Sequence, residues 1–194
     1  MDMDLILAST SLYRKRLLQR LQLPFRCIAP RVDETAQPAE AAPAMAARLA
    51  LAKARVVAAA NPGSLVIGSD QVAALEGSPI GKPGTHTRAR EQLLAAAGRT
   101  VQFHTAVALC WQQRDMEQLH TEPFTVQFRP LSATMIESYL QREQPYDCAG
   151  SFKCEGLGIA LFESLAGTDP TSLEGLPLIA LTGMLAKAGY PVLA

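Results

Sequence analysis

Leu65-Val66-Ile67-Gly68-Ser69-Asp70-Gln71 is the stretch of sequence that decides the fold. Its apolar run is typical of a buried strand, and we expect that strand to end at Ser69-Asp70-Gln71. Enzymes of the α/β class keep their chemistry at the ends of such strands. The chain opens in the same way, because residues 5–8 lead into Ser9-Thr10-Ser11 and a basic helix. The two strand ends are therefore predicted to supply opposite chemistries, a carboxylate and a cluster of hydroxyl and basic groups.

The remaining pattern predicts helices and strands in alternation. Helical spacing of apolar residues indicates helices at residues 12–21, 43–60, 87–97, from Ser132 onward, and 176–188. Short strands are expected at 25–29 and 72–75, and two long strands at 101–111 and 116–128. The irregular stretch 146–158 is expected to be a long ordered loop with a function. Nothing forces a domain boundary, so residues 1–194 are predicted to form a single domain.

The Ala-rich helix predicted at residues 43–60 has one apolar face. At helical spacing, Leu49, Ala52 and Val56 are expected to face the core. Arg48 and Lys53 are then expected to lie elsewhere, on the surface of the molecule.

The composition limits the classes of partner. A chain of 194 residues with 48% hydrophobic content can bury a substantial core. Its 18 basic and 18 acidic residues cancel, so no overall field attracts a nucleic acid polymer or an anionic membrane. Any anion must therefore be held by a local cluster of charges.

The cysteines and the N-terminal sequence indicate a compartment. Cys27, Cys110, Cys148 and Cys154 form no CxxC pair. The start of the chain lacks the basic region and long apolar stretch of a signal peptide, and no apolar run reaches the roughly 20 residues of a membrane span. We expect a reduced, cytoplasmic protein without a transmembrane segment.

The turn after the first strand has two interpretations. Amide groups at a helix start, joined by the hydroxyl groups of Ser9 and Ser11, form a site of phosphate size. Arg14 would strengthen that site, because a guanidinium binds two phosphate oxygens at once. In the alternative, Ser9 or Ser11 only caps the helix.

Three carboxylates are candidates for a hard cation. Asp70, Asp33 and Glu34 suit magnesium, which uses few carboxylates and completes its shell with water and substrate phosphate. In the alternative, Asp33 and Glu34 belong to an exposed polar loop and Asp70 to an ordinary strand-end turn. Lys53 and Lys82, each taken alone, are expected to be solvent-exposed charged side chains.

Several other sites are not indicated. His86, His104 and His120 have no spacing typical of zinc ligands, and the cysteines complete no such site. The sequence has no GxSxG elbow of a serine hydrolase and no P-loop signature.

The chain resembles the Maf family of nucleotide pyrophosphatases over nearly its whole length. Six motifs in compatible order carry the resemblance: Leu7-Ala8-Ser9-Thr10-Ser11 followed by Arg14, Val32-Asp33-Glu34, Gly68-Ser69-Asp70, Gly81-Lys82-Pro83, Ala149-Gly150-Ser151-Phe152, and Gly175-Leu176-Pro177-Leu178. The resemblance implies a two-lobed α/β fold around a mixed sheet flanked by helices, related to inosine triphosphate pyrophosphatases. It also implies a cleft between the lobes and a homodimer.

The resemblance further implies attack of water on the α-phosphorus of a nucleoside triphosphate, with a divalent metal, Mg²⁺ or Mn²⁺, present. Asp70 would be the catalytic residue that takes the proton of the water or holds the metal, and Glu34 would help to hold the metal. The phosphate-binding residues would be Ser9, Ser11, Arg14, Lys53 and Lys82.

Three residues are similar to the family branch that acts on 7-methyl-GTP: Tyr13, Gln71 and Glu155. A 7-methylated guanine carries positive charge, so it stacks well on a phenol ring and is offset by a carboxylate. Related chains of this branch often have tryptophan in place of Tyr13 and serine in place of Cys154. The alternatives are a pyrimidine (dTTP/UTP) or broad-specificity pyrophosphatase and, in another class, a nucleotide-binding regulator of cell division.

Overall fold

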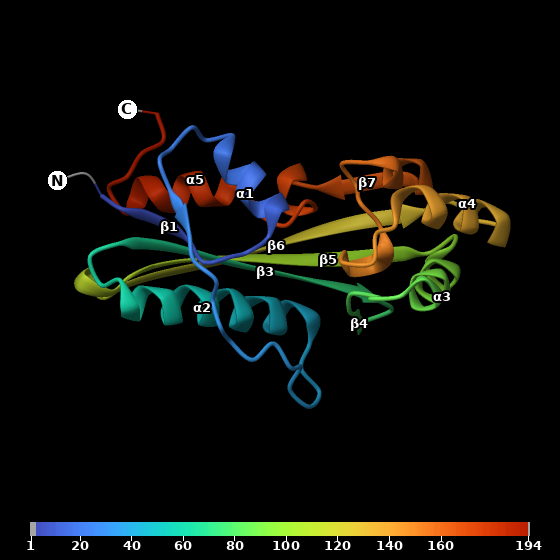
Figure 1. Cartoon of the computed structure of the whole chain (residues 1–194), viewed down its shortest axis with the longest axis horizontal. Helices are drawn as coiled ribbons and strands as arrows, with labels where there is room; N and C mark the ends of the chain where they lie inside the picture. Colours follow the sequence, from blue (N-terminus) through green and yellow to red (C-terminus); the bar gives the residue numbers. More distant parts are fainter. Residues whose placement is uncertain (1–2, 194) are drawn as a thin grey trace.

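A mixed sheet of seven strands runs the length of the molecule in the computed structural model, which describes residues 3–193 (Figure 1). The strands are β1 (Leu5–Leu7), β2 (Arg26–Cys27), β3 (Leu65–Leu75), β4 (Ser78–Ile80), β5 (Thr100–Trp111), β6 (Met116–Phe128) and β7 (Phe162–Gly167). Their order is β2-β1-β3-β5-β6-β7, with β4 also paired to β3. β1 is parallel to both neighbours, and the other pairs are antiparallel. The predicted mixed α/β sheet is confirmed.

Within the described residues five α-helices flank the sheet: α1 (Leu12–Gln19), α2 (Ala42–Ala60), α3 (His86–Ala96), α4 (Ala133–Glu143) and α5 (Leu178–Lys187). Figure 1 shows α2 along one face, α1 and α5 on the other, and α3 and α4 at the far end of the long strands. None of these helices is both long and apolar enough to cross a membrane.

Alternation along the strands separates two parts of the core. Leu7 and Ile67 point towards α1 and α5, while Ile6 and Val66 point towards the Ala-rich face of α2. This alternation follows from the two-residue period of a strand. Each face of the inner sheet is therefore buried under a helical layer.

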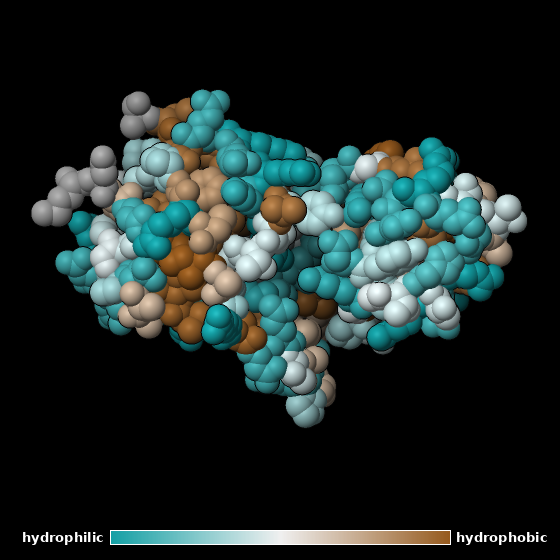
Figure 2. All heavy atoms as spheres, viewed as in Figure 1, coloured by the Kyte–Doolittle hydropathy of each residue, from teal (hydrophilic) through white to brown (hydrophobic). Residues whose placement is uncertain are grey.

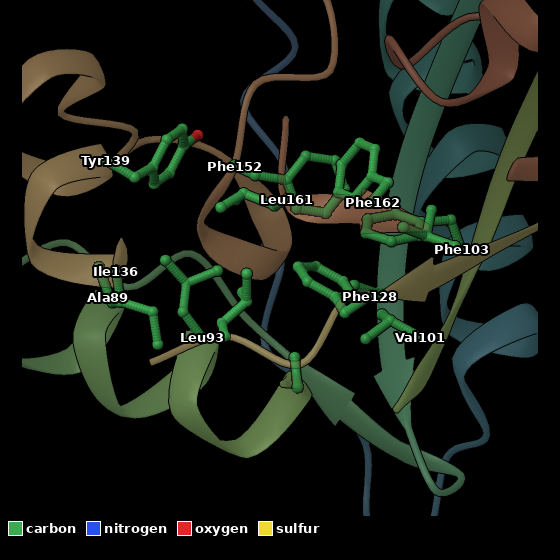
Figure 3. Packing of buried hydrophobic residues seen from close by; sticks show 14 of the residues in the cluster. Ala89, Leu93, Val101, Phe103, Phe128, Ile136, Tyr139, Phe152, Leu161 and Phe162 are labelled. Atoms are coloured by element: carbon green, nitrogen blue, oxygen red, sulfur yellow. The ribbon is translucent and has the colours of Figure 1, made fainter. Parts of the chain in front are cut away.

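A third cluster forms the core of the far lobe. Figure 3 shows side chains of α3 and α4 converging on the aromatic rings that the strands and the 146–158 loop contribute. Phe152 belongs to that loop, and its ring centre lies 4.7 Å from that of Phe162 and 5.3 Å from that of Phe103. Edge-on contacts of this kind are favourable for aromatic pairs. Phe152 therefore anchors the loop in the core, and its expected order is confirmed.

The molecule has two rounded masses with a hollow between them (Figure 2). One mass contains α1, α2 and α5, and the other contains α3 and α4 (Figure 1). The predicted two-lobed shape is therefore confirmed.

The prediction that β3 ends at Asp70 is wrong. β3 continues to Leu75 because β5 pairs with it without interruption from Val66 to Leu75. Its other edge changes partner, since β3 pairs with β1 only as far as Ile67 and with β4 only from Ala73 onward. Residues 68–72 are therefore open on that edge, and Asp70 lies beside the end of β1 rather than at the end of its own strand.

The predicted surface position of Lys53 is also wrong. Lys53 is only 5% exposed and shares the buried face of α2 with Ala46, Ala50 and Ala54, whereas Val56 is 44% exposed. The aliphatic part of the Lys53 side chain is buried on the alanine-rich face of α2. The general tendency of charged residues to lie on the surface of a helix therefore gives the wrong position for Lys53.

Other differences are smaller. α1 and α5 are shorter than predicted, β2 has only two residues, and sequence analysis missed β7 and the pairing of β4. The long strands at 101–111 and 116–128 are confirmed, with β5 beginning one residue earlier.

Gly68 sets the distance between α2 and β3. A Cβ at Gly68 would overlap the carbonyl oxygen of Ala50 and lie 2.7 Å from the amide nitrogen of Ala54. Only a glycine allows the helix backbone to approach the strand this closely.

We expect Gly68→Ala to destabilise the protein by about 1–3 kcal/mol, because the methyl group must push α2 away from the sheet. The measurement is urea unfolding followed by circular dichroism. Gly183→Ala is the matched control, since a Cβ at this helical position meets nothing within 4 Å. That control should stabilise by about 0.5–1 kcal/mol. Equal stability of the Gly68→Ala variant and the parent would contradict the close approach.

Candidate active site

A cavity of about 970 Å³ opens beside the free edge of β3. The turn between β1 and α1, the face of α2 and the loop after β4 contribute to its wall. Glu155 and Asp33 do not line it, but the other nine of the eleven candidate residues do: Ser9, Ser11, Tyr13, Arg14, Glu34, Lys53, Asp70, Gln71 and Lys82. Asp33 lines neither this cavity nor the one next to it, because its carboxylate binds Thr35 in an exposed turn.

Lys53 joins two of the carboxylates of this cavity, those of Glu34 and Asp70. Its ammonium lies 2.6 Å from Asp70 Oδ1 and 2.7 Å from Glu34 Oε1. Asp70 is 7% exposed on β3, whereas Glu34 comes from the exposed loop before α2. The buried ammonium therefore connects the loop that carries Glu34 to strand β3 of the sheet.

Positive charge around Glu34 keeps it ionised. Partial burial raises the pKa of Glu34, but the hydrogen bond from Lys53 and the charges of Lys53, Lys82 and Arg14 outweigh that effect. The pKa of Glu34 is therefore lowered, and the carboxylate is negative at neutral pH.

The turn before α1 is ordered by its serines. Ser11 caps α1, because its hydroxyl accepts a hydrogen bond from the amide of Arg14 at 3.4 Å. Ser9 is 5% exposed, and its hydroxyl accepts from the amide of Ser11 at 3.1 Å. The capping interpretation is confirmed for Ser11, and anion binding by this turn stays a prediction.

Arg14 is aimed by the chain near the C-terminus. Its Nε donates to the carbonyl oxygen of Gly175 at 2.9 Å, and the Ser69 hydroxyl lies 2.9 Å from the same oxygen. Gly175 has φ +110°, a conformation that favours glycine. The remaining guanidinium donors of Arg14 can therefore serve the cavity that this side chain lines.

A second cavity of about 120 Å³ adjoins the first. Tyr13, Gln71 and Arg14 line both cavities, and Glu155 lines the second. The structure thus brings together the three residues predicted for base specificity, which come from α1, β3 and the 146–158 loop.

The amide group of Gln71 has a fixed orientation. Its Nε2 donates to Thr105 Oγ1 at 3.0 Å and to the carbonyl oxygens of Ser172 and Leu173 at 2.9 and 3.1 Å. Both N–H groups are therefore used within the protein. Only the amide oxygen is left for a ligand, so Gln71 can offer an acceptor and no donor.

Tyr13 presents a neutral phenol to the second cavity. Burial raises the pKa of Tyr13, with the negative charges of Asp147 and Glu155 acting in the same direction. Its hydroxyl oxygen lies 3.9 Å from Cys148 Sγ. The ring is therefore an uncharged stacking surface at any physiological pH.

Sequence analysis missed two carboxylates of the second cavity. Asp147 lines both cavities, and Glu174 lines the second while pairing with Arg20 at 3.0 Å. Glu174 directly precedes the motif that begins at Gly175, and this neighbouring motif is the feature of the sequence that could have pointed to Glu174.

The carboxylates fit a cation that takes few protein ligands. Within residues 3–193, no group of three or more His, Cys, Asp or Glu side chains could hold a metal ion. Asp70 and Glu34 each have one oxygen without a hydrogen-bond partner among the described residues. Two carboxylates completed by water and phosphate oxygens are the usual donor set for magnesium.

Comparison with known proteins identifies the family of this chain. The chain matches the family described as Maf-like protein over residues 4–188. It is 57% identical over 189 residues to the 7-methyl-GTP pyrophosphatase of Xanthomonas axonopodis pv. citri (strain 306), covering 97% of this chain and 98% of that protein. A 7-methyl-GTP pyrophosphatase of Nitrosococcus oceani is also 57% identical, with 97% of this chain and 95% of that protein covered.

A solved structure supports the fold. The chain is similar to a HAM1 protein from Coxiella burnetii, with a TM-score of 0.56, 18% identity, and coverage of 95% of this chain and 99% of that one. At this identity the likeness concerns the fold alone. The family match and the close relatives carry the assignment: the chain belongs to the Maf family.

Proposed function

We propose that this protein is a nucleoside triphosphate pyrophosphatase that hydrolyses 7-methyl-GTP to 7-methyl-GMP and pyrophosphate. The observation that carries the proposal is the pair of adjoining cavities. The larger one combines basic side chains with two paired carboxylates, and the smaller one presents hydrogen-bond acceptors beside a phenol ring. The close relatives named 7-methyl-GTP pyrophosphatase support the same reaction.

The smaller cavity suits a cationic, donor-rich base. Gln71 offers only its amide oxygen, and Glu155 offers a carboxylate. The N1–H and N2–H₂ groups of guanine are donors that would match these acceptors. The 7-methylated ring would stack on Tyr13, and the carboxylate of Glu155 would offset its positive charge.

The larger cavity suits the triphosphate and the attacking water. Arg14 and Lys82 line it and would neutralise charge on the phosphates and on the departing pyrophosphate. Asp70 would take the proton of a water that attacks the α-phosphorus, directly or as a ligand of the cation. A divalent cation, Mg²⁺ or Mn²⁺, held by Asp70 and Glu34 would supply further positive charge to the phosphate oxygens.

We also propose that the protein works as a homodimer in the cytoplasm. The family resemblance supports the dimer, and the four free thiols, Cys27, Cys110, Cys148 and Cys154, suit a reducing compartment. Sedimentation equilibrium would measure the mass of the assembly.

The reaction itself is tested by hydrolysis of 7-methyl-GTP in ¹⁸O-labelled water. We expect 7-methyl-GMP that carries the label and pyrophosphate that does not, because water attacks the α-phosphorus. Label in pyrophosphate, or release of orthophosphate and 7-methyl-GDP, would refute this reaction. Nucleotide binding without turnover would favour a regulator of cell division instead.

Asp70→Asn should lower kcat by at least about 100-fold, because an amide cannot take the proton of the water. The measurement is pyrophosphate release under saturating 7-methyl-GTP, together with a thermal melt to establish that the variant folds. Asp33→Asn is the matched control, since Asp33 is an exposed carboxylate that lines neither cavity. Near-normal turnover of a folded Asp70→Asn variant would remove Asp70 from the mechanism.

Glu155→Gln should lower the ratio of kcat/KM for 7-methyl-GTP to that for GTP by about tenfold, because a neutral amide no longer offsets the charged ring. Steady-state kinetics with both nucleotides measure the ratio. The control is Glu163→Gln on the exposed β7 strand, which should leave the ratio unchanged. An unchanged ratio in Glu155→Gln would show that this carboxylate does not read the base.

A further inference from the structure

The ammonium of Lys53 occupies the space between the two carboxylates that are candidates for a divalent cation. It lies 2.6 Å from Asp70 Oδ1 and 2.7 Å from Glu34 Oε1, and Lys53 is only 5% exposed. Its position is fixed from α2, which is pressed against β3 at Gly68. A buried positive charge with two short contacts to carboxylates is well stabilised, and removing it from them is costly.

The cavity as a whole carries an excess of positive charge. Its charged lining residues are four basic and three acidic: Arg14, Arg16, Lys53 and Lys82, with Glu34, Asp70 and Asp147. A free divalent cation therefore meets one cation already seated on its ligands, while the other charged lining residues, three basic and three acidic, supply no net negative charge to attract it. A nucleoside triphosphate adds several negative charges and reverses that balance.

We propose that Lys53 is a resident counter-cation of the Glu34–Asp70 pair, which opposes the binding of a divalent cation until a nucleotide is bound. This inference rests on the proposed function, because it concerns the cation of that same site. Lys53 thereby has a positioning role distinct from phosphate binding: it keeps the loop of Glu34 against the sheet while the nucleotide is absent.

The test is nucleotide-free binding of Mn²⁺, measured from the electron paramagnetic resonance signal of the free ion. Lys53→Met retains a long unbranched stem on the helix and removes the competing ammonium. We expect it to bind Mn²⁺ at least about tenfold more tightly than the parent protein. Lys82→Met is the matched control, since it removes a cation of the same cavity that has no ion pair among the described residues.

The control distinguishes competition between the Lys53 ammonium and Mn²⁺ for the carboxylates from a general effect of removing one positive charge from the cavity. Lys82→Met should change the Mn²⁺ affinity by less than about threefold, because Lys82 is exposed and screened. Equal gains in both variants would contradict a seated counter-cation, and so would a folded Lys53→Met variant with no gain.

A measurement on the parent protein avoids any loss of folding in the variants. The ¹⁵N signal of the Lys53 ammonium should persist when millimolar Mg²⁺ is added alone, and it should change when Mg²⁺ and the α,β-methylene analogue of 7-methyl-GTP are added together. Loss of the signal with Mg²⁺ alone, or an unchanged signal with both, would overturn the inference. If the parent releases pyrophosphate but fails these tests, only this inference is lost; if it releases none, the proposed function fails first.

Discussion

The close packing of α2 on β3 at Gly68 is the constraint on which the rest of the structure depends. Without a side chain at Gly68, the backbone of the helix lies directly against the strand. Lys53 lies on the helix between the two residues that meet Gly68, and Asp70 is the next residue of β3 on the same face. Their contact of 2.6 Å is therefore a consequence of main-chain packing. The same packing that fills the core thus delivers a charged pair to the cavity.

The two faces of β3 carry different parts of the candidate site. Asp70 points towards α2 and the larger cavity, while Ser69 and Gln71 point towards the segment that leads into α5. Ser69 and Arg14 both contact the carbonyl oxygen of Gly175, so that segment also orients the guanidinium. One strand therefore connects the Lys53–Asp70 pair, the segment that orients Arg14 and the smaller cavity. The open edge at residues 68–72 is what makes this strand accessible to a ligand.

Sequence reasoning succeeded where a local pattern determines the outcome. The long strands β5 and β6, the cap at Ser11 and the apolar face of α4 follow from spacing and turn chemistry. It failed at Lys53 and at the end of β3, because burial of a charged side chain and continuation of a strand depend on a distant partner. The meeting of Tyr13 with Glu155 joins segments far apart in the sequence, and only the family resemblance indicated it.

The most direct test of this account is pyrophosphate release from 7-methyl-GTP, GTP, UTP, dTTP, CTP and ITP, with and without Mg²⁺ or Mn²⁺. The account predicts release that requires the metal and a kcat/KM that is highest for 7-methyl-GTP, because the smaller cavity combines acceptors, a carboxylate and a phenol ring. Preference for UTP or dTTP would contradict the assignment of that cavity. Absence of pyrophosphate release from every nucleotide would contradict the account as a whole.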